Sequence, residues 1–252
     1  MSYPGGLRPS SVVTIAGGGR QGLGEHVGWE LENHLRFAER CGGWLPVPGR
    51  GPVGDLADAI DPAADAYART ALEGALIDLA LKQAGESLPP ADGLRTVIST
   101  DDLATVAAHP GASFKVDVDP AWTDDDLAAL AQIDLVVLDF KERGDATLAT
   151  RLRRAFPRAI FEDPPPGAPG PVALDRPILT AGDAALAARS GRFVNLKAPR
   201  MGGFRELLRA LDACSAAAYF GGMFEVGPGR ALARQLAAMF TPAAPNDLAL
   251  LR

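Results

Sequence analysis

The sequence has few cysteines and histidines, no excess of positive charge and no long hydrophobic run. Cys41 and Cys214 lie far apart without metal-type spacing, which excludes a disulfide framework and indicates two reduced thiols. The three histidines form no pair at ligand spacing, so we expect no histidine-based zinc site. The formal net charge of -6 provides no basic surface for nucleic acid or for a membrane, and we expect neither partner.

No stretch approaches the roughly 18 uninterrupted apolar residues of a membrane-spanning helix. The first residues also lack a charged segment followed by an apolar one, as in a secretory leader. We therefore expect a cytoplasmic globular protein, and its 47% of hydrophobic residues can form a substantial core. The sequence leaves open whether it forms a homo-oligomer.

Two parts of the chain differ in pattern. Residues 11–16 predict a strand, residues 26–40 a helical stretch, and residues 63–84 a helix that ends before Gly85. From residue 94, short apolar runs alternate with helical segments, which is typical of a parallel sheet. The runs are 94–100, 113–119, 133–140, 158–164, 176–183, 192–199 and 217–225, with an eighth near 246–251. We predict a modified (β/α)8, TIM-like barrel over 93–252, preceded by a reduced α+β domain over 1–92.

Charged residues lie at or just after the ends of five of these runs. In such barrels the active site lies at the carboxyl ends of the strands. Carboxylates gathered there are the oxygen ligands that Mg²⁺ prefers, and a partly buried lysine beside them could act as a base. The candidates are Asp139, Glu162 and Asp183 as metal ligands, Lys197 as the base and Glu225 as a substrate contact or a partner of Arg230.

The stretch FKVDVDPAW, residues 114–122, is an apolar strand with charges on one face. Because side chains alternate along a strand, Lys115, Asp117 and Asp119 point one way, and Val116 and Val118 point the other. Lys115 and Asp117 are therefore further catalytic candidates, and Lys141 is a second candidate, with Glu225, for binding the substrate.

Several segments resemble the enolase superfamily, in the branch of o-succinylbenzoate synthase and N-acylamino acid racemase. They are RFVNLKAPRMGG (192–203), YFGGMFEVGPGRA (219–231), IFEDP (160–164), LVVLDFK (135–141), FKVDVDPAW and ALEGALIDLALKQAGESL (71–88). The resemblance implies a capping domain on the barrel, Mg²⁺ holding the carboxylate of a small-molecule substrate, and removal of the proton α to it. For the synthase, this is the dehydration of a cyclohexadiene carboxylate in menaquinone biosynthesis.

Carried over by the resemblance, Asp139 and Glu162 are metal ligands and Lys197 is a catalytic lysine. Three positions depart from the pattern. Lys115 matches the first of two expected lysines, but Asp117 stands in place of the second, and Lys141 replaces an asparagine next to the metal strand. Asp183 matches the third ligand only after a two-residue shift.

Two alternatives stay open. In the first, Lys115 and Lys141 neutralise Asp117 and Asp139, which leaves a degenerate barrel with a binding or partner role and neither metal nor catalysis. In the second, the G-x-G-x-x-G spacing of residues 17–22 after a strand indicates a nucleotide-binding oxidoreductase. The acidic residue that should end a second strand is not evident, and the resemblance treats this segment as a hairpin.

Overall fold

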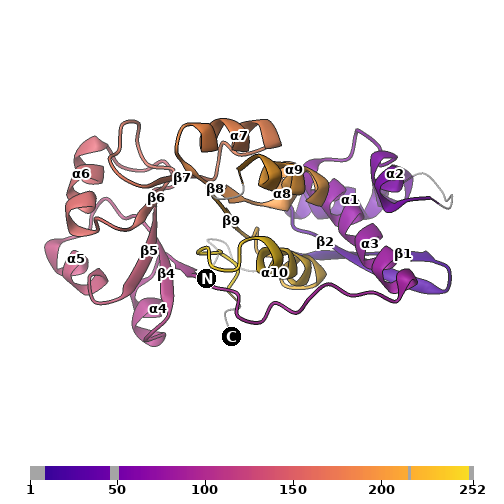
Figure 1. The fold of residues 1–252 in the computed structure, drawn as a ribbon, viewed down its shortest axis with the longest axis horizontal. Coiled ribbons are helices and arrows are strands. Elements are labelled where there is room, and N and C mark those ends of the chain that lie inside the picture. Colours follow the sequence, from indigo (N-terminus) through magenta and orange to yellow (C-terminus); the bar gives the residue numbers. More distant parts are fainter. Residues whose placement is uncertain (1–8, 46–50, 215–216, 250–252) are drawn as a thin grey trace.

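The computed structural model describes residues 9–45, 51–214 and 217–249. An antiparallel hairpin and three helices form the capping part. They are β1 (Ser11–Gly17), β2 (Arg20–His26), α1 (Leu31–Trp44), α2 (Val53–Asp58) and α3 (Ala66–Ala84). Figure 1 shows these elements together at one end of the molecule, with the chain after α3 returning along its lower edge to the barrel.

The glycines of the hairpin serve a turn and a close packing contact. Gly18 and Gly19 have φ of +56° and +74° in the turn, which glycine adopts without strain. A side chain on Gly24 would place its Cβ 1.8 Å from the Ala71 carbonyl oxygen on α3, so β2 can lie directly on that helix. Because a second strand follows the turn, this is not the strand-to-helix turn of a dinucleotide site, and the nucleotide-binding interpretation is wrong.

Seven parallel strands form the second part, in the order in which they occur in the chain. The strands are β3 (Ile98–Thr100), β4 (Ser113–Asp117), β5 (Asp134–Asp139), β6 (Ile160–Glu162), β7 (Val172–Leu174), β8 (Phe193–Leu196) and β9 (Ala218–Phe220). The helices are α4 (Leu103–Ala108), α5 (Asp124–Leu130), α6 (Ala146–Ala155), α7 (Ala181–Arg189), α8 (Ala198–Met201), α9 (Phe204–Cys214) and α10 (Pro228–Phe240). The modified TIM-like barrel predicted from the sequence is confirmed.

An abbreviated eighth segment joins the two edges of this curled sheet. Asn246 bridges Thr96 and Asp247 bridges Gly221, both in parallel. The predicted run 246–251 thus contributes two bridging residues, and its last two positions lie outside the described residues. The predicted strand at 176–183 is wrong: the fifth strand is Val172–Leu174, and residues 178–180 lead into α7.

Alternation along the strands separates an apolar outer layer from a polar interior. Phe114, Val116, Leu138 and Phe161 pack in one buried apolar cluster with residues of α5 and α6. The residues that alternate with these four along β4, β5 and β6 face inward, because successive side chains point to opposite faces. A barrel interior is commonly filled by branched apolar residues, so this polar filling marks the site.

Glu25 on β2 fastens the cap to the barrel. Its carboxylate accepts backbone N–H groups of Val226, Gly227 and Gly229 at 2.7, 2.9 and 3.0 Å, at the start of α10.

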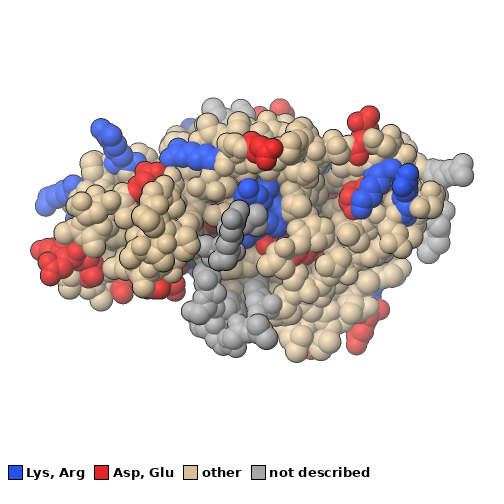
Figure 2. Space-filling model, turned by 90° about the horizontal axis from the view of Figure 1, so that it is seen from below, with Lys and Arg blue, Asp and Glu red and all other residues tan. Residues whose placement is uncertain are grey.

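On the face in Figure 2, charged side chains form small scattered groups without a continuous basic field. Within the described ranges, none of the helices combines the length and apolarity that crossing a membrane requires.

Replacing Gly24 with alanine tests the contact between β2 and α3. Because the added Cβ meets helix backbone, we expect Gly24→Ala to lower the free energy of unfolding by about 2–4 kcal/mol. Gly42 is the matched control, since it lies in α1 with open space around its Cα. Gly42→Ala should raise stability by up to about 1 kcal/mol. Urea denaturation measures both, and equal effects would contradict the packing assignment.

Candidate active site

The carboxyl ends of the barrel strands bring charged side chains together. Asp117, Asp139 and Glu162 end β4, β5 and β6, and they are direct neighbours in the strand register. Side chains from β4, from the later strand ends and from the eighth segment complete a set of ion pairs in two groups, one around Lys115 and one around Asp175. We call it the ion cluster: Lys115, Asp117, Asp139, Lys141, Glu162, Asp175, Lys197, Arg200 and Asp247.

Lys115 lies at the centre of one half of the ion cluster. Its side chain is 1% exposed, and its Nζ lies 3.0 Å from Asp139 Oδ2, 3.3 Å from Asp247 Oδ2 and in a hydrogen-bonded ion pair with Glu162. Burial alone would lower the pKa of the ammonium, but the surrounding carboxylates raise it well above its usual value. Lys115 is therefore a permanent cation at ordinary pH.

Lys141 is the more exposed of the two lysines in this half of the ion cluster. Its Nζ pairs with Asp139 and lies 3.4 Å from Asp117 Oδ1, and its side chain is 40% exposed. Its backbone N–H donates to Asp139 Oδ1 at 3.0 Å, which holds Lys141 at a φ of +48°. Burial raises the pKa of Asp117, and the nearby Lys141 opposes that shift.

The two adjacent carboxyl groups Asp139 and Glu162 titrate differently. Burial raises the pKa of both, but Lys115 and Lys141 outweigh it at Asp139, whose pKa is lowered. Burial raises the pKa of Glu162 to about 8, opposed by Lys115 and reinforced by Asp139. The Tyr219 hydroxyl donates to Glu162 Oε2, and the Asn195 amide donates to both of its oxygens at 3.3 Å.

The second half of the ion cluster surrounds Asp175, which directly follows β7. Lys197 Nζ lies 2.7 Å from Asp175 Oδ2, and Arg200 lies 2.8 Å from its Oδ1. Burial raises the pKa of Asp175, but Lys197 and further cations outweigh it, and the net shift is downward. The Asp163 carboxylate accepts the backbone N–H groups of Asp175 and Arg176, which fixes this strand end.

Asp183 is not brought to the ion cluster. Its carboxylate accepts the backbone N–H and hydroxyl of Thr180 in the capping box of α7. The reason is the strand position: since β7 ends at Leu174, the acid that follows the fifth strand is Asp175.

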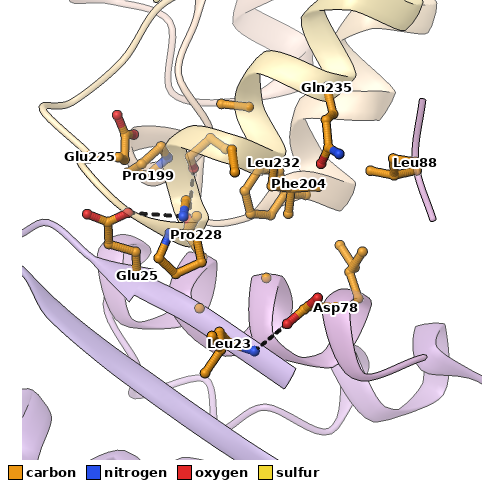
Figure 3. Close-up of a pocket in the computed structure, with 18 of the residues that line it drawn as sticks. Leu23, Glu25, Asp78, Leu88, Pro199, Phe204, Glu225, Pro228, Leu232 and Gln235 are labelled. Atoms are coloured by element: carbon orange, nitrogen blue, oxygen red, sulfur yellow. Dashed lines mark hydrogen bonds between the residues drawn. The ribbon is translucent and has the colours of Figure 1, made fainter. Parts of the chain in front are cut away.

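Glu225 lies in the loop after β9 and takes no part in the ion pairs of the ion cluster. It is buried, its Oε2 accepts the Met223 N–H at 2.9 Å, and the Arg230 guanidinium donates to its backbone carbonyl. Burial raises the pKa of its carboxyl group, opposed by Arg230. Glu225 lines a cavity between cap and barrel (Figure 3). The cavity has a volume of about 210 Å³, and none of the ion-cluster residues lines it.

The carboxylates as placed do not fit a magnesium ion. Mg²⁺ requires oxygen ligands about 2.0–2.1 Å away in near-octahedral geometry. Here the Lys115 nitrogen contacts both Asp139 and Glu162, and Asp175 is bound by Lys197 and Arg200. In the part of the chain that the structure describes, no three acidic, histidine or cysteine side chains are arranged to hold a metal ion.

Sequence reasoning missed five residues of this region: Asp175, Asn195, Arg200, Tyr219 and Asp247. Period-two alternation could have found Asn195, which lies two positions before Lys197 on the inward face. Asp175 follows a strand of three residues, and Asp247 lies in a segment with two bridges, so neither has a clear apolar run before it.

A parallel barrel with acids on successive strand ends and a lysine on a later one, beneath an α+β cap, defines the enolase class of barrels. Two solved structures share this fold with the chain. The mandelate racemase/muconate lactonizing protein from Herpetosiphon aurantiacus has a TM-score of 0.80 at 22% identity, over 98% of this chain and 84% of that one. The dipeptide epimerase from Enterococcus faecalis V583 has a TM-score of 0.77 at 21% identity, over 95% and 84%.

The family assignment follows from the sequence matches. The chain belongs to the family described as domain of unknown function (DUF8230), whose N-terminal and C-terminal domains match residues 3–91 and 92–251. Its fold and part of its sequence are similar to those of enolase-superfamily proteins.

Two curated relatives match part of the chain. It is 32% identical over 165 residues to an o-succinylbenzoate synthase from Enterococcus faecalis (strain ATCC 700802 / V583), which is 62% of this chain and 42% of the relative. It is 32% identical over 147 residues to an N-succinylamino acid racemase from Amycolatopsis sp, which is 53% and 36%. The matches thus span less than half the length of these two relatives.

Neutral substitutions of Asp139 and Glu162 test whether the two carboxyl groups differ in charge. At pH 6, Asp139→Asn leaves Lys115 and Lys141 short of a counter-charge and should lower the free energy of unfolding by about 3–5 kcal/mol. Glu162→Gln replaces a group that is already largely protonated, and it should cost less than half as much. Equal costs in urea denaturation at pH 6 would contradict this assignment.

Stability should also fall at alkaline pH because of Glu162. Its pKa is higher in the folded state, about 8, than its ordinary value of 4.5, so its stabilising contribution is present at low pH and is lost as pH rises through about 8. We expect unfolding free energy to decrease from pH 6 to pH 9, and Glu162→Gln to flatten that slope. A slope unchanged in the variant would assign the effect to another group.

Proposed function

We propose that this chain acts on a small carboxylate in the lyase or epimerase class of its superfamily, with Lys197 transferring the proton α to the carboxylate. The observation that carries the proposal is the position of Lys197, which directly follows β8, pairs with Asp175 and acts electrostatically on Glu162 at the end of β6. Its side chain is 9% exposed, so the amine is shielded from bulk water and still reachable from the barrel mouth. In this proposal residues 1–92 are the cap and 93–252 the barrel.

The substrate is a carboxylate that carries a succinyl group. The names of both curated relatives contain this group, in o-succinylbenzoate and in N-succinylamino acids. Lys141 is suited to receive the substrate carboxylate because its ammonium is the most exposed cation of the cluster half around Asp139. Glu225 stabilises the loop after β9 by accepting a backbone N–H group, and it is a second candidate for contacting the substrate.

The reaction best suited to these residues is a one-base dehydration of the o-succinylbenzoate synthase type. Once its ammonium has released a proton, Lys197 removes the α-proton, and negative charge develops on the substrate carboxylate next to Lys141. The Lys197 ammonium then returns that proton to the departing hydroxyl group, which leaves as water, and the lysine is restored. Racemisation needs a base on each face of the carbon, and Asp117, paired with Lys141, stands where the second lysine is expected.

A bound magnesium ion would stabilise the charge of the enediolate, as the resemblance implies. Since the carboxylates as placed do not fit that ion, the proposed steps rest on the lysines alone. A role in menaquinone biosynthesis and a cytoplasmic location remain predictions from the sequence.

A second candidate function is ligand or partner binding without catalysis. The observation that favours it is the internal pairing of the ion cluster, where each of the five carboxylates lies within 3.4 Å of a cationic nitrogen. A cluster neutralised in this way needs no substrate to balance its charge.

Proton transfer can be measured directly for both substrate classes. In D₂O, we expect the purified chain to exchange the α-proton of N-succinyl amino acids, followed by NMR, or to form o-succinylbenzoate from its cyclohexadiene carboxylate precursor, followed by absorbance. Lys197→Ala should reduce the rate by about 10²–10⁴-fold, the usual contribution of a general base.

Lys82→Ala is the matched control, since Lys82 is an exposed α3 lysine paired with Asp78 outside the ion cluster. It should leave the rate unchanged. Absence of both exchange and dehydration would favour the binding function, and full turnover in Lys197→Ala would refute the base assignment.

A further inference from the structure

Three carboxylates from separate elements surround the Lys115 ammonium. They come from the end of β5, the end of β6 and the eighth segment, and we call Asp139, Glu162 and Asp247 the carboxylate ring. Lys115 enters from β4 and is fully buried, so these groups see little bulk water. An ammonium has three N–H donors and the ring provides three acceptors, one from each side chain.

The carboxylate ring would be strongly destabilising without a central cation. Carboxylates held close together away from bulk water repel one another strongly. In a barrel of this type a divalent ion could relieve that repulsion, and here the lysine nitrogen occupies the space between the oxygens.

Neighbouring groups hold the ring in place from outside. Tyr219 and Asn195 donate to Glu162, and Lys141 pairs with Asp139. Asn195 is 1% exposed, and its Oδ1 has no hydrogen-bond partner within the described residues. The ring therefore has fixed oxygen donors and one further amide oxygen nearby.

We propose that Lys115 is a resident cation that takes the place of a divalent metal in this barrel. The wild-type chain then binds no divalent ion at the ring. Removing the ammonium frees the three carboxylates, which become a site for a hard divalent cation such as Mg²⁺, Mn²⁺ or Ca²⁺. This inference does not depend on the proposed reaction, because it concerns metal affinity and not turnover.

Calorimetric titration of the wild-type chain with MgCl₂, MnCl₂ and CaCl₂ is the first test. No heat of one-to-one binding is expected at millimolar metal. Stoichiometric binding that Asp139→Asn abolishes would overturn the proposal. This test does not depend on whether a Lys115 variant folds.

Lys115→Ala provides the second test. At metal concentrations about 100-fold above its Kd, its melting temperature should rise by about 5–10 °C. The melting temperatures of the wild type and of Lys82→Ala should stay constant. Lys115→Met keeps most of the side-chain volume without the charge. It replaces Lys115→Ala in this measurement if the alanine variant does not fold.

The double variant Lys115→Ala/Asp139→Asn should lose the metal response. A folded Lys115 variant with no change in melting temperature on addition of any of the three metals would refute the resident-cation role. Failure here is distinct from failure of the proposed function, because the proton-exchange assay does not report on the ring.

Discussion

The ion pairs of the Lys115 ammonium are the interaction on which the polar barrel interior depends. A fully buried lysine loses its hydration, and only close carboxylates can offset that cost. Asp139, Glu162 and Asp247 provide them from three elements, so the curvature of the sheet and the closure by the eighth segment both contribute to one charge centre. Removing Asp139 leaves this buried ammonium short of a counter-charge.

Charge balance extends from this centre across the whole site. The ion cluster contains five carboxyl groups and four cationic side chains. When Glu162 is protonated, the negative charges equal the positive charges in number. Lys141 and Lys197 belong to the two separate groups of the ion cluster, and the Lys141 side chain is the more exposed of the two. The same arrangement that makes a divalent ion unnecessary thus leaves two lysines at the mouth, where a substrate carboxylate and its α-carbon would meet them.

Much of the barrel was predictable because apolar runs and strand-end charges follow simple periodicities. Asp139, Glu162 and Lys197 were found in this way, and all three lie in the ion cluster. The third acid was missed because β7 has only three residues, and the apolar stretch 177–180 after it looked more like a strand. The pairing of Lys115 with Asp247 could not be predicted, since it depends on how the last segment closes the barrel over more than a hundred residues of sequence separation.

The most direct test of the central claim is a crystal structure grown with millimolar Mn²⁺ and measured at the manganese absorption edge. The account predicts the Lys115 nitrogen between Asp139, Glu162 and Asp247, with no anomalous peak at that position. A manganese peak between Asp139 and Glu162, with the Lys115 side chain displaced, would contradict it.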